Sequence, residues 1–264
     1  MEEIAHIKEV ARQAAIKAGK ILRSGLKKEL TISYKGESDL VTQIDTLSEQ
    51  TIVSCIKKQF PDHLILAEEG TNQGGNSPWR WIIDPLDGTT NYTHRFPYFA
   101  VSIGVEYRSS MAVGLVYNPI HKELFMAERG KGATLNDQPL RVSSPSCLKE
   151  ALLVTGFAYN HRTDPNNNIN YFSDFLMKAQ GLRRMGSAAL DLCYVAAGRF
   201  DGFWELNLHP WDTAAGSLIL TEAGGLVTDF SAKPFDINKK EILATNGKIH
   251  AEMVAVFNKA QSAA

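Results

Sequence analysis

Residues 79–91 read Trp-Arg-Trp-Ile-Ile-Asp-Pro-Leu-Asp-Gly-Thr-Thr-Asn. The apolar start of this stretch predicts a buried strand, and two carboxylates, Asp84 and Asp87, follow it directly. Gly88-Thr89-Thr90 then predicts the beginning of a helix. Hard cations prefer carboxylate oxygens, and the amide groups at a helix start attract phosphate. The stretch therefore predicts a metal-assisted phosphoryl site, although an ordinary Asp-Gly turn between a strand and a helix remains open.

The bulk composition favours a globular protein without a strong charge bias. The chain has 264 residues, of which 44% are apolar and 22% charged, and its formal net charge is −1. This balance gives no electrostatic sign of direct nucleic-acid binding or of attraction to a membrane. Three scattered cysteines, Cys55, Cys147 and Cys193, fit a reducing compartment. Because no signal peptide or membrane-spanning apolar run is evident, we expect a cytoplasmic protein.

The N-terminal half, residues 1–142, is expected to combine helices with an antiparallel sheet that carries most of the metal ligands. Apolar residues at helical spacing predict helices over residues 2–27 and about 44–60. Short apolar or alternating runs predict strands at 64–67, 79–83, 99–107, 111–117 and 123–128.

A polar stretch at residues 142–146 marks the expected boundary with the C-terminal half, residues 143–264. The second half alternates strands and helices, which predicts mixed α/β layers rather than a bundle or a sandwich of sheets. The expected strands are 152–155 and 200–205, and the expected helices are 165–179, 187–197, 210–223 and one beginning near 247.

Other acidic residues stand at the ends of apolar elements. Glu68 follows a predicted strand, Asp45 lies near the start of the second helix, and Asp212 lies in the first turn of a distant helix. Each could simply be solvated or oppose a helix dipole. Together with Asp84 and Asp87, they would repel one another unless a cation neutralised them.

Histidine chemistry is not expected, because His94, His121, His161 and His209 are not paired at metal-ligand spacing. The glycine-containing polar segment Lys35–Ser38 is a candidate for a mobile loop that closes over the site.

Taken together, these motifs resemble the inositol monophosphatase family of magnesium-dependent, lithium-sensitive phosphatases. The two signatures are Trp81–Asn91 and Trp211–Gly216, preceded by Asp39–Asp45 and Ala67–Gly70. The segment Arg183–Asp191 is similar to the bacterial SuhB-type branch. The resemblance implies a five-layer αβαβα sandwich, with the site in the cleft between the halves and Asp212 supplied by the second half.

The resemblance also implies a set of two to three Mg²⁺ ions per site. Glu68, Asp84 and the backbone carbonyl of Leu86 would bind the first ion, and Glu68 would also face a weaker third. Asp84, Asp87 and Asp212 would bind the second. These ligand assignments are implied by the resemblance to the family and do not follow from the spacing of the acidic residues.

The substrate and the attacking water are assigned in the same way. The amides of Gly88 and Thr89 would hold the phosphate, and Thr89 paired with Asp45 would polarise the water, with Glu68 assisting. Ala188, Glu205 and Asp212 would contact the substrate.

The implied reaction is Mg²⁺-dependent hydrolysis of inositol monophosphate to myo-inositol and phosphate by a metal-activated water, in a homodimer. Other substrates of the superfamily remain open, namely fructose-1,6-bisphosphate, a 3′-phosphoadenosine nucleotide or histidinol phosphate. A binding role is also open, because SuhB-type proteins are partners of RNA polymerase and its antitermination machinery. Arg183-Arg184 carries that resemblance, although two arginines could equally cap a strand or line a dimer interface.

Overall fold

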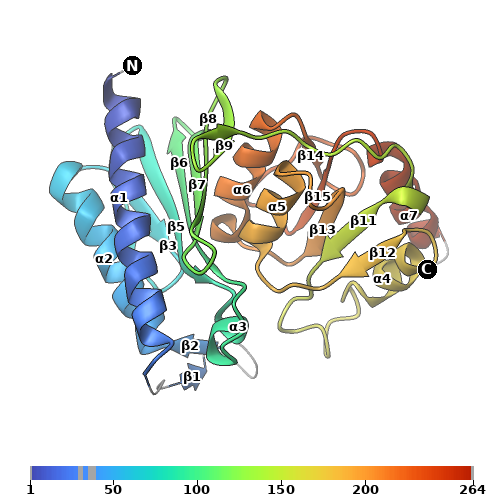
Figure 1. The fold of residues 1–264 in the computed structure, drawn as a ribbon, viewed down its shortest axis with the longest axis horizontal. Coiled ribbons are helices and arrows are strands. Elements are labelled where there is room, and N and C mark those ends of the chain that lie inside the picture. The colour runs from blue at the N-terminus through green and yellow to red at the C-terminus, as the bar shows by residue number, and fades with distance from the viewer. Residues whose placement is uncertain (1, 29–31, 35–39, 263–264) are drawn as a thin grey trace.

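The computed structural model describes residues 2–28, 32–34 and 40–262 (Figure 1). The expected mobile loop Lys35–Ser38 lies outside the described residues. The helices are α1 (Glu2–Gly25), α2 (Gln43–Gln59), α3 (Thr89–Thr93), α4 (Ile169–Leu176), α5 (Ala188–Ala196), α6 (Pro210–Glu222) and α7 (His250–Ser262), with a 3₁₀ turn η1 (Leu148–Glu150).

The strands form three sheets. They are β1 (Ile32–Tyr34), β2 (Leu40–Thr42), β3 (Leu64–Ala67), β4 (Asn72–Gln73), β5 (Trp79–Asp87), β6 (Ala100–Tyr107), β7 (Ser110–Asn118), β8 (Glu123–Glu128), β9 (Gly132–Leu135), β10 (Gln138–Pro139), β11 (Leu152–Thr155), β12 (Gly181–Arg183), β13 (Gly202–Leu206), β14 (Leu226–Thr228) and β15 (Glu241–Thr245).

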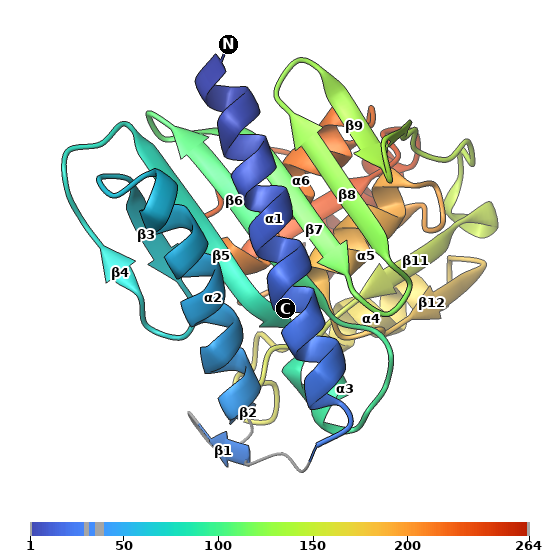
Figure 2. The same ribbon diagram turned by 60° about the vertical axis from the view of Figure 1, so that its left-hand side comes forward.

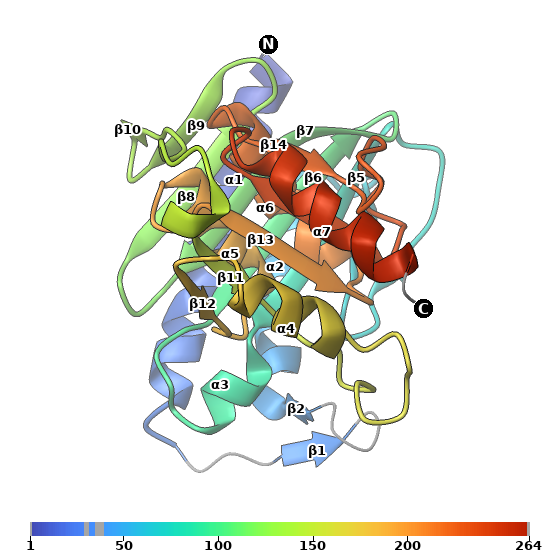
Figure 3. The same cartoon turned by 90° about the vertical axis from the view of Figure 1, so that its right-hand side faces the viewer.

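The two large sheets and three pairs of helices make five layers, which confirms the expected αβαβα sandwich. Helices α1 and α2 cover one face of the eight-stranded sheet, β10-β9-β8-β7-β6-β5-β3-β4 (Figure 2). Helices α5 and α6 lie between that sheet and the five-stranded sheet, β12-β11-β13-β15-β14 (Figure 1). Helices α4 and α7 cover the outer face of the second sheet (Figure 3).

Strand β5 has packing partners on both of its faces, which explains the unbroken apolar run of residues 81–83. Trp81 and Ile83 join the hydrophobic core beneath α1 and α2. Ile82, which points the other way, joins the core around α5 and α6. All three side chains are fully buried, and each such burial contributes roughly 1.5–3 kcal/mol or more to stability.

The acidic turn expected after residue 83 is instead the last part of β5. Asp84 pairs with Ser102 and Asp87 with Ala100 of β6, and the register shifts between these two pairs. Pro85 has no amide hydrogen to give to the ladder, and prolines inside sheets are found at such irregularities. The prediction of a strand ending at residue 83 was therefore wrong, while the helix predicted to follow Gly88 is present as the short α3.

In the second half, the predicted helix over 165–179 is shorter than expected. The structure has α4 over Ile169–Leu176, preceded by Asn168 in a left-handed conformation with a φ of 72°. The amide of Asn166 is held by the Asp164 side chain at 2.8 Å, which forms a turn rather than a helix. The last helix likewise begins at His250 rather than near Gly247.

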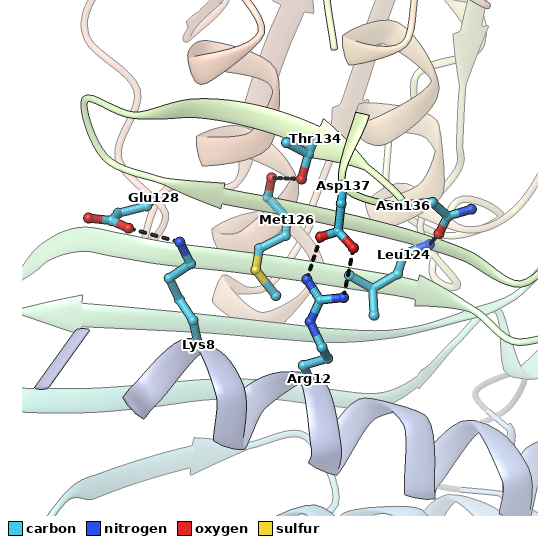
Figure 4. Close-up of polar contacts among 8 residues, drawn as sticks. All are labelled: Lys8, Arg12, Leu124, Met126, Glu128, Thr134, Asn136 and Asp137. Carbon is cyan, nitrogen blue, oxygen red and sulfur yellow. Dashed lines mark hydrogen bonds and ion pairs between the residues drawn. The ribbon is translucent and has the colours of Figure 1, made fainter. Parts of the chain in front are cut away.

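Helix α1 is tied to the far end of the large sheet by ion pairs (Figure 4). Lys8 Nζ lies 2.9 Å from Glu128 Oε2, and Arg12 Nη2 lies 2.7 Å from Asp137 Oδ1. Since these side chains are still partly accessible to water, the pairs fix the position of the helix more than they stabilise the fold. None of the helices in the described ranges is both long and apolar enough to cross a membrane.

His250, at the start of α7, is buried between two hydroxyl groups. Its Nε2 lies 3.0 Å from Thr228 Oγ1 and its Nδ1 lies 3.0 Å from Thr245 Oγ1. Burial lowers the pKa of this imidazole below its ordinary value. The start of a helix also disfavours a positive charge. The folded protein therefore disfavours protonation of His250.

We expect this histidine to make the fold less stable in mild acid. As the pH falls below about 6.5, His250 gains a proton more readily in the unfolded chain than in the folded protein, so stability falls by up to about 1.4 kcal/mol per pH unit. Urea unfolding between about pH 7.5 and 5.5 should show a steeper loss for the wild type than for His250→Gln. The control is His6→Gln at an exposed position, which should retain the wild-type slope. Parallel slopes for wild type and His250→Gln would contradict the prediction.

Candidate active site

A pocket of about 410 Å³ opens where the two halves of the chain meet. Its walls come from the end of β5 and the start of α3, the loop after β11, the start of α5, and the segment between β13 and α6. All of the residues implied by the resemblance line this pocket except Asp45, which lies just behind Thr89.

Strand pairing brings Glu68 and Asp84 to the same edge of the sheet. Strands β3 and β5 are parallel, and Ala67 is opposite Ile83. The amide of Glu68 then donates to the Ile83 carbonyl at 3.1 Å. Glu68 and Asp84 each follow this last residue pair of the β3–β5 ladder, so the two acidic residues lie side by side, although β5 itself continues to Asp87.

The second half of the chain holds Asp87 in place. Ser187 Oγ donates to Asp87 Oδ2 at 2.6 Å, and the amide of Ala189 donates to the same oxygen at 2.8 Å. Ser187 is also the N-cap residue of α5. One carboxylate from the first half is therefore held at the start of a helix from the second.

Asp212 lies in the first turn of α6 and forms a capping arrangement with His209. The His209 amide donates to Asp212 Oδ2 at 2.7 Å. The His209 ring stacks on Trp211 with a centroid separation of 4.8 Å and an interplanar angle of 13°. His209 thus supports the helix start, and Trp211 is a partly buried wall of the pocket rather than a fully buried core residue.

Burial raises the pKa values of Asp84, Asp87 and Asp212, and neighbouring carboxylates add to the rise for Asp84 and Asp212. The pKa of Asp84 is well above its ordinary value because of burial, and then because of Glu68, Asp87 and Asp212. Burial raises the pKa of Asp87 to about 6, against the opposing hydrogen bonds from Ser187 and α5 amides. The pKa of Asp212 is also raised, first by burial and then by Asp87 and Glu68. Asp212 therefore belongs to the same electrostatic cluster as the acids of the first half.

Thr89 and Asp45 form a separate, buried pair. Thr89 Oγ1 lies 3.0 Å from Asp45 Oδ1 and 3.1 Å from the Leu86 carbonyl oxygen, so its single hydrogen has two acceptors. The other oxygen of Asp45 accepts from the Thr42 amide at 2.9 Å and completes the capping box of α2. Burial raises the pKa of Asp45, and the hydrogen bonds from Thr42 and Thr89 oppose that rise.

Gly88 precedes α3 with a φ of 100°, which side chains rarely adopt. A β-carbon at this position would also lie 3.1 Å from the Tyr98 carbonyl oxygen and 3.2 Å from that of Gly186. Only glycine fits here, and it lets the backbone of residues 88 and 89 form part of the pocket wall.

The comparison with known families agrees with this geometry. The model of the inositol monophosphatase family matches residues 3–262. The chain belongs to the inositol monophosphatase family. It is therefore a phosphatase of a family that is generally metal-dependent, and the resemblance seen in its motifs is confirmed.

Individual relatives of the inositol monophosphatase family support the assignment. An inositol-1-monophosphatase from Synechocystis is 47% identical over 93% of this chain and 86% of its own length. The Nus factor SuhB of Pseudomonas aeruginosa is 43% identical over 90% of this chain and 91% of its own. The solved inositol monophosphatase of Anabaena is 43% identical, covers 97% of both chains and has a TM-score of 0.89.

The donor set of this inositol monophosphatase family member has the chemistry that a hard cation needs. The four carboxylates of the set, of which Asp84 and Asp87 are buried, line one pocket, and carboxylate oxygens are the ligands that Mg²⁺ and Ca²⁺ prefer. As they stand, however, no three His, Cys, Asp or Glu side chains of the described ranges are arranged to hold a metal ion. Asp87 and Asp212 each direct one carboxylate oxygen to a protein donor, as metal-ligating carboxylates commonly do.

Several residues of the site were not predicted as functional. Asn91 Nδ2 donates to the carbonyls of Tyr98 at 2.7 Å and Met185 at 2.8 Å, which joins the two halves beside the pocket. Buried Asp191 accepts from Tyr98 Oη at 2.7 Å. Asn91 and Asp191 both stand inside the quoted motifs, so their position was a usable signal. Ser187 lies inside the quoted segment Arg183–Asp191 as well, but its bond to Asp87 spans a hundred residues and does not follow from local spacing.

Proposed function

We propose that this protein hydrolyses inositol monophosphate to myo-inositol and phosphate with Mg²⁺. The observation that carries the proposal is the cluster of carboxylates, Glu68, Asp84, Asp87 and Asp212, that line one pocket. At its centre, burial and then the charges of the other three raise the pKa of Asp84. A cluster of this kind, open to a pocket of about 410 Å³, is suited to cations and a phosphate monoester together. The proposed halves, residues 1–142 and 143–264, would share the site.

The metal ligands proposed are Glu68, Asp84, the Leu86 carbonyl, Asp87 and Asp212. Magnesium held there would lower the pKa of a bound water and neutralise charge on the phosphoryl group. The chain's own residues orient the reactants. The Thr89 hydroxyl, held by Asp45, positions the attacking water, and the amides of Gly88 and Thr89 hold phosphate oxygens at the start of α3.

The remaining pocket residues are proposed to bind the ring of the substrate. Glu205 is nearly buried, lines the pocket and has a raised pKa because of burial and the nearby Asp191. A carboxyl group at this position can exchange hydrogen bonds with hydroxyl groups of a polyol. Ala188 has the small side chain that leaves room for the ring beside it.

Metal removal tests the proposed function directly. Phosphate release from inositol 1-phosphate should be lost after treatment with EDTA and restored by Mg²⁺, and Li⁺ should inhibit it. A panel with fructose-1,6-bisphosphate, a 3′-phosphoadenosine nucleotide and histidinol phosphate, each at equal concentration, ranks the substrates. Undiminished turnover in EDTA would refute the metal mechanism, and a strong preference for another member of the panel would refute the substrate.

A binding role is the second proposal, because one relative at 43% identity is a Nus factor. Arg183 and Arg184 are exposed side chains at the edge of the second sheet. Pull-down with RNA polymerase and its elongation factors tests this role. Rescue of a deletion strain by Asp84→Asn would show that binding, and not hydrolysis, is the biological activity.

We further propose that the protein is a cytoplasmic homodimer. Its cysteines, Cys55, Cys147 and Cys193, are free, as is usual in a reducing compartment. Light scattering after size-exclusion chromatography measures the oligomeric state, and a monomer at micromolar concentration would contradict the dimer.

A further inference from the structure

The carboxyl group of Glu205 lies directly over the backbone of Gly156. A β-carbon built on Gly156 would fall 2.2 Å from Glu205 Oε1 and 2.3 Å from Cδ and Oε2. No real side chain can occupy that space together with Glu205. The φ of Gly156 is not in the left-handed region, so glycine is required here for space alone.

Strand pairing explains why these two residues meet. Strands β11 and β13 are parallel, and Thr155 is opposite Trp204. Gly156 follows Thr155 and Glu205 follows Trp204, so the two residues lie side by side just beyond this last pair. Both then line the pocket.

One buried side chain fixes the backbone beneath Glu205. Asn168, which is 3% exposed, donates through Nδ2 to the Gly156 carbonyl at 2.7 Å and to Thr155 Oγ1 at 2.9 Å. Its Oδ1 accepts from Trp204 Nε1 at 2.6 Å. Asn168 therefore joins Trp204, the residue before Glu205, to Gly156, the residue beneath the Glu205 carboxyl group. These bonds hold the floor of this part of the pocket in place.

We propose that Gly156 is a specificity-determining residue, because the absence of its side chain lets the Glu205 carboxyl take the position from which it meets the hydroxyl groups of a polyol substrate. The inference rests on the proposed function, since it concerns the contact that selects a hydroxylated ring. Gly156 acts through Glu205 and has no part in the phosphoryl chemistry.

The structure indicates how a methyl group at residue 156 would be accommodated. The backbone is held by Asn168 and cannot retreat easily. The clashing atoms are the far end of the flexible Glu205 side chain, and the pocket beside them offers open volume. The carboxyl group should therefore rotate away while the fold is retained.

The experiment compares Gly156→Ala with the wild type on two substrates in saturating Mg²⁺. For inositol 1-phosphate, kcat/KM should fall about tenfold to a hundredfold, which is typical for the loss of a hydrogen bond to a charged group. For phenyl phosphate, which has no hydroxyl groups on its ring, kcat/KM should change less than about twofold. Equal losses on both substrates would overturn the proposal.

Two further variants separate a shift of Glu205 from general damage. Gly74→Ala is the matched control, because a β-carbon at Gly74 meets nothing within 4 Å, and it should behave as the wild type on both substrates. In a Glu205→Gln background, Gly156→Ala should add little to the selective loss, because both changes remove the same contact. Fully additive losses would place the effect of Gly156 elsewhere and refute the proposal.

The outcomes also distinguish this inference from the proposed function. A wild type that cleaves phenyl phosphate but not inositol 1-phosphate refutes the proposed substrate, and the role of Gly156 with it. A wild type that cleaves both, with unchanged selectivity in Gly156→Ala, refutes the role of Gly156 alone. If Gly156→Ala does not fold, Glu205→Asp withdraws the carboxyl by one methylene and should show the same selective loss; unchanged selectivity there contradicts the proposal.

Discussion

Asp84→Asn should lower the turnover of inositol 1-phosphate by about 10³-fold or more while the protein stays folded, since cation-assisted phosphoryl transfer draws several kcal/mol from such ligands. Asp84 lies at the centre of the acidic cluster, where burial first, and then Glu68, Asp87 and Asp212, raise its pKa. An amide of the same shape removes the charge that would attract a cation. It retains an oxygen that can accept from the Leu86 amide, as Asp84 Oδ1 does at 2.9 Å.

Stability measurements give this prediction a second readout. Without added metal, Asp84→Asn should be at least as stable as the wild type, because it removes a buried charge that its neighbours repel. With Mg²⁺, only the wild type should show a clear rise in melting temperature, because a ligand that binds the folded state stabilises it. A variant with full activity, or with an undiminished response to Mg²⁺, would refute the role of Asp84.

The matched control is Asp229→Asn, which is the same change at another buried carboxyl. Asp229 is 6% exposed, and its Oδ1 accepts from the amides of Ser231 at 3.0 Å and Lys233 at 2.8 Å. The asparagine oxygen can keep both bonds. Activity and the response to Mg²⁺ should therefore be unchanged.

The acidic edge of the first sheet was predictable because it follows from strand direction. Glu68 and Asp84 each follow a run of apolar residues, and parallel pairing of those runs places them together. The sequence could not show that β5 continues through Asp84 to Asp87, because the irregularity at Pro85 depends on pairing with β6. Hydrophobic periodicity identifies a buried strand but does not set its end when the following residues are polar and still paired.

The parts of the site that were missed depend on contacts between distant segments. Gly156 lies under Glu205 only because β11 and β13 are adjacent and parallel, and the chain between them carries no sign of that order. Asn168 lies in the stretch 165–179 that was predicted to be a helix, yet it is the buried residue that joins these strands. Its side chain satisfies three groups at once, which is a property of the fold and not of the local sequence.

Thr89→Ala should lower kcat by about 10²–10⁴-fold with little change in KM, which is the usual effect of removing a group that handles the proton of the attacking water. Thr89 is 6% exposed, and its hydroxyl lies between Asp45 Oδ1 at 3.0 Å and the Leu86 carbonyl at 3.1 Å. One hydrogen cannot serve both acceptors fully. When the Leu86 carbonyl has another partner, such as the proposed cation, the hydroxyl hydrogen of Thr89 is left to Asp45. A lone pair of the Thr89 hydroxyl oxygen can then accept a hydrogen bond from water.

Thr89→Ser distinguishes the hydroxyl from the rest of the side chain. Serine places an oxygen on the same carbon, so it can donate to Asp45 as threonine does, and it should retain activity within about tenfold of the wild type. Both variants should keep the stabilisation by Mg²⁺, because Thr89 is not among the proposed ligands. Steady-state kinetics and melting with and without Mg²⁺ measure these effects. Equal losses in the serine and alanine variants would show that the buried methyl group, by packing beside Asp45, is what the reaction needs from this residue.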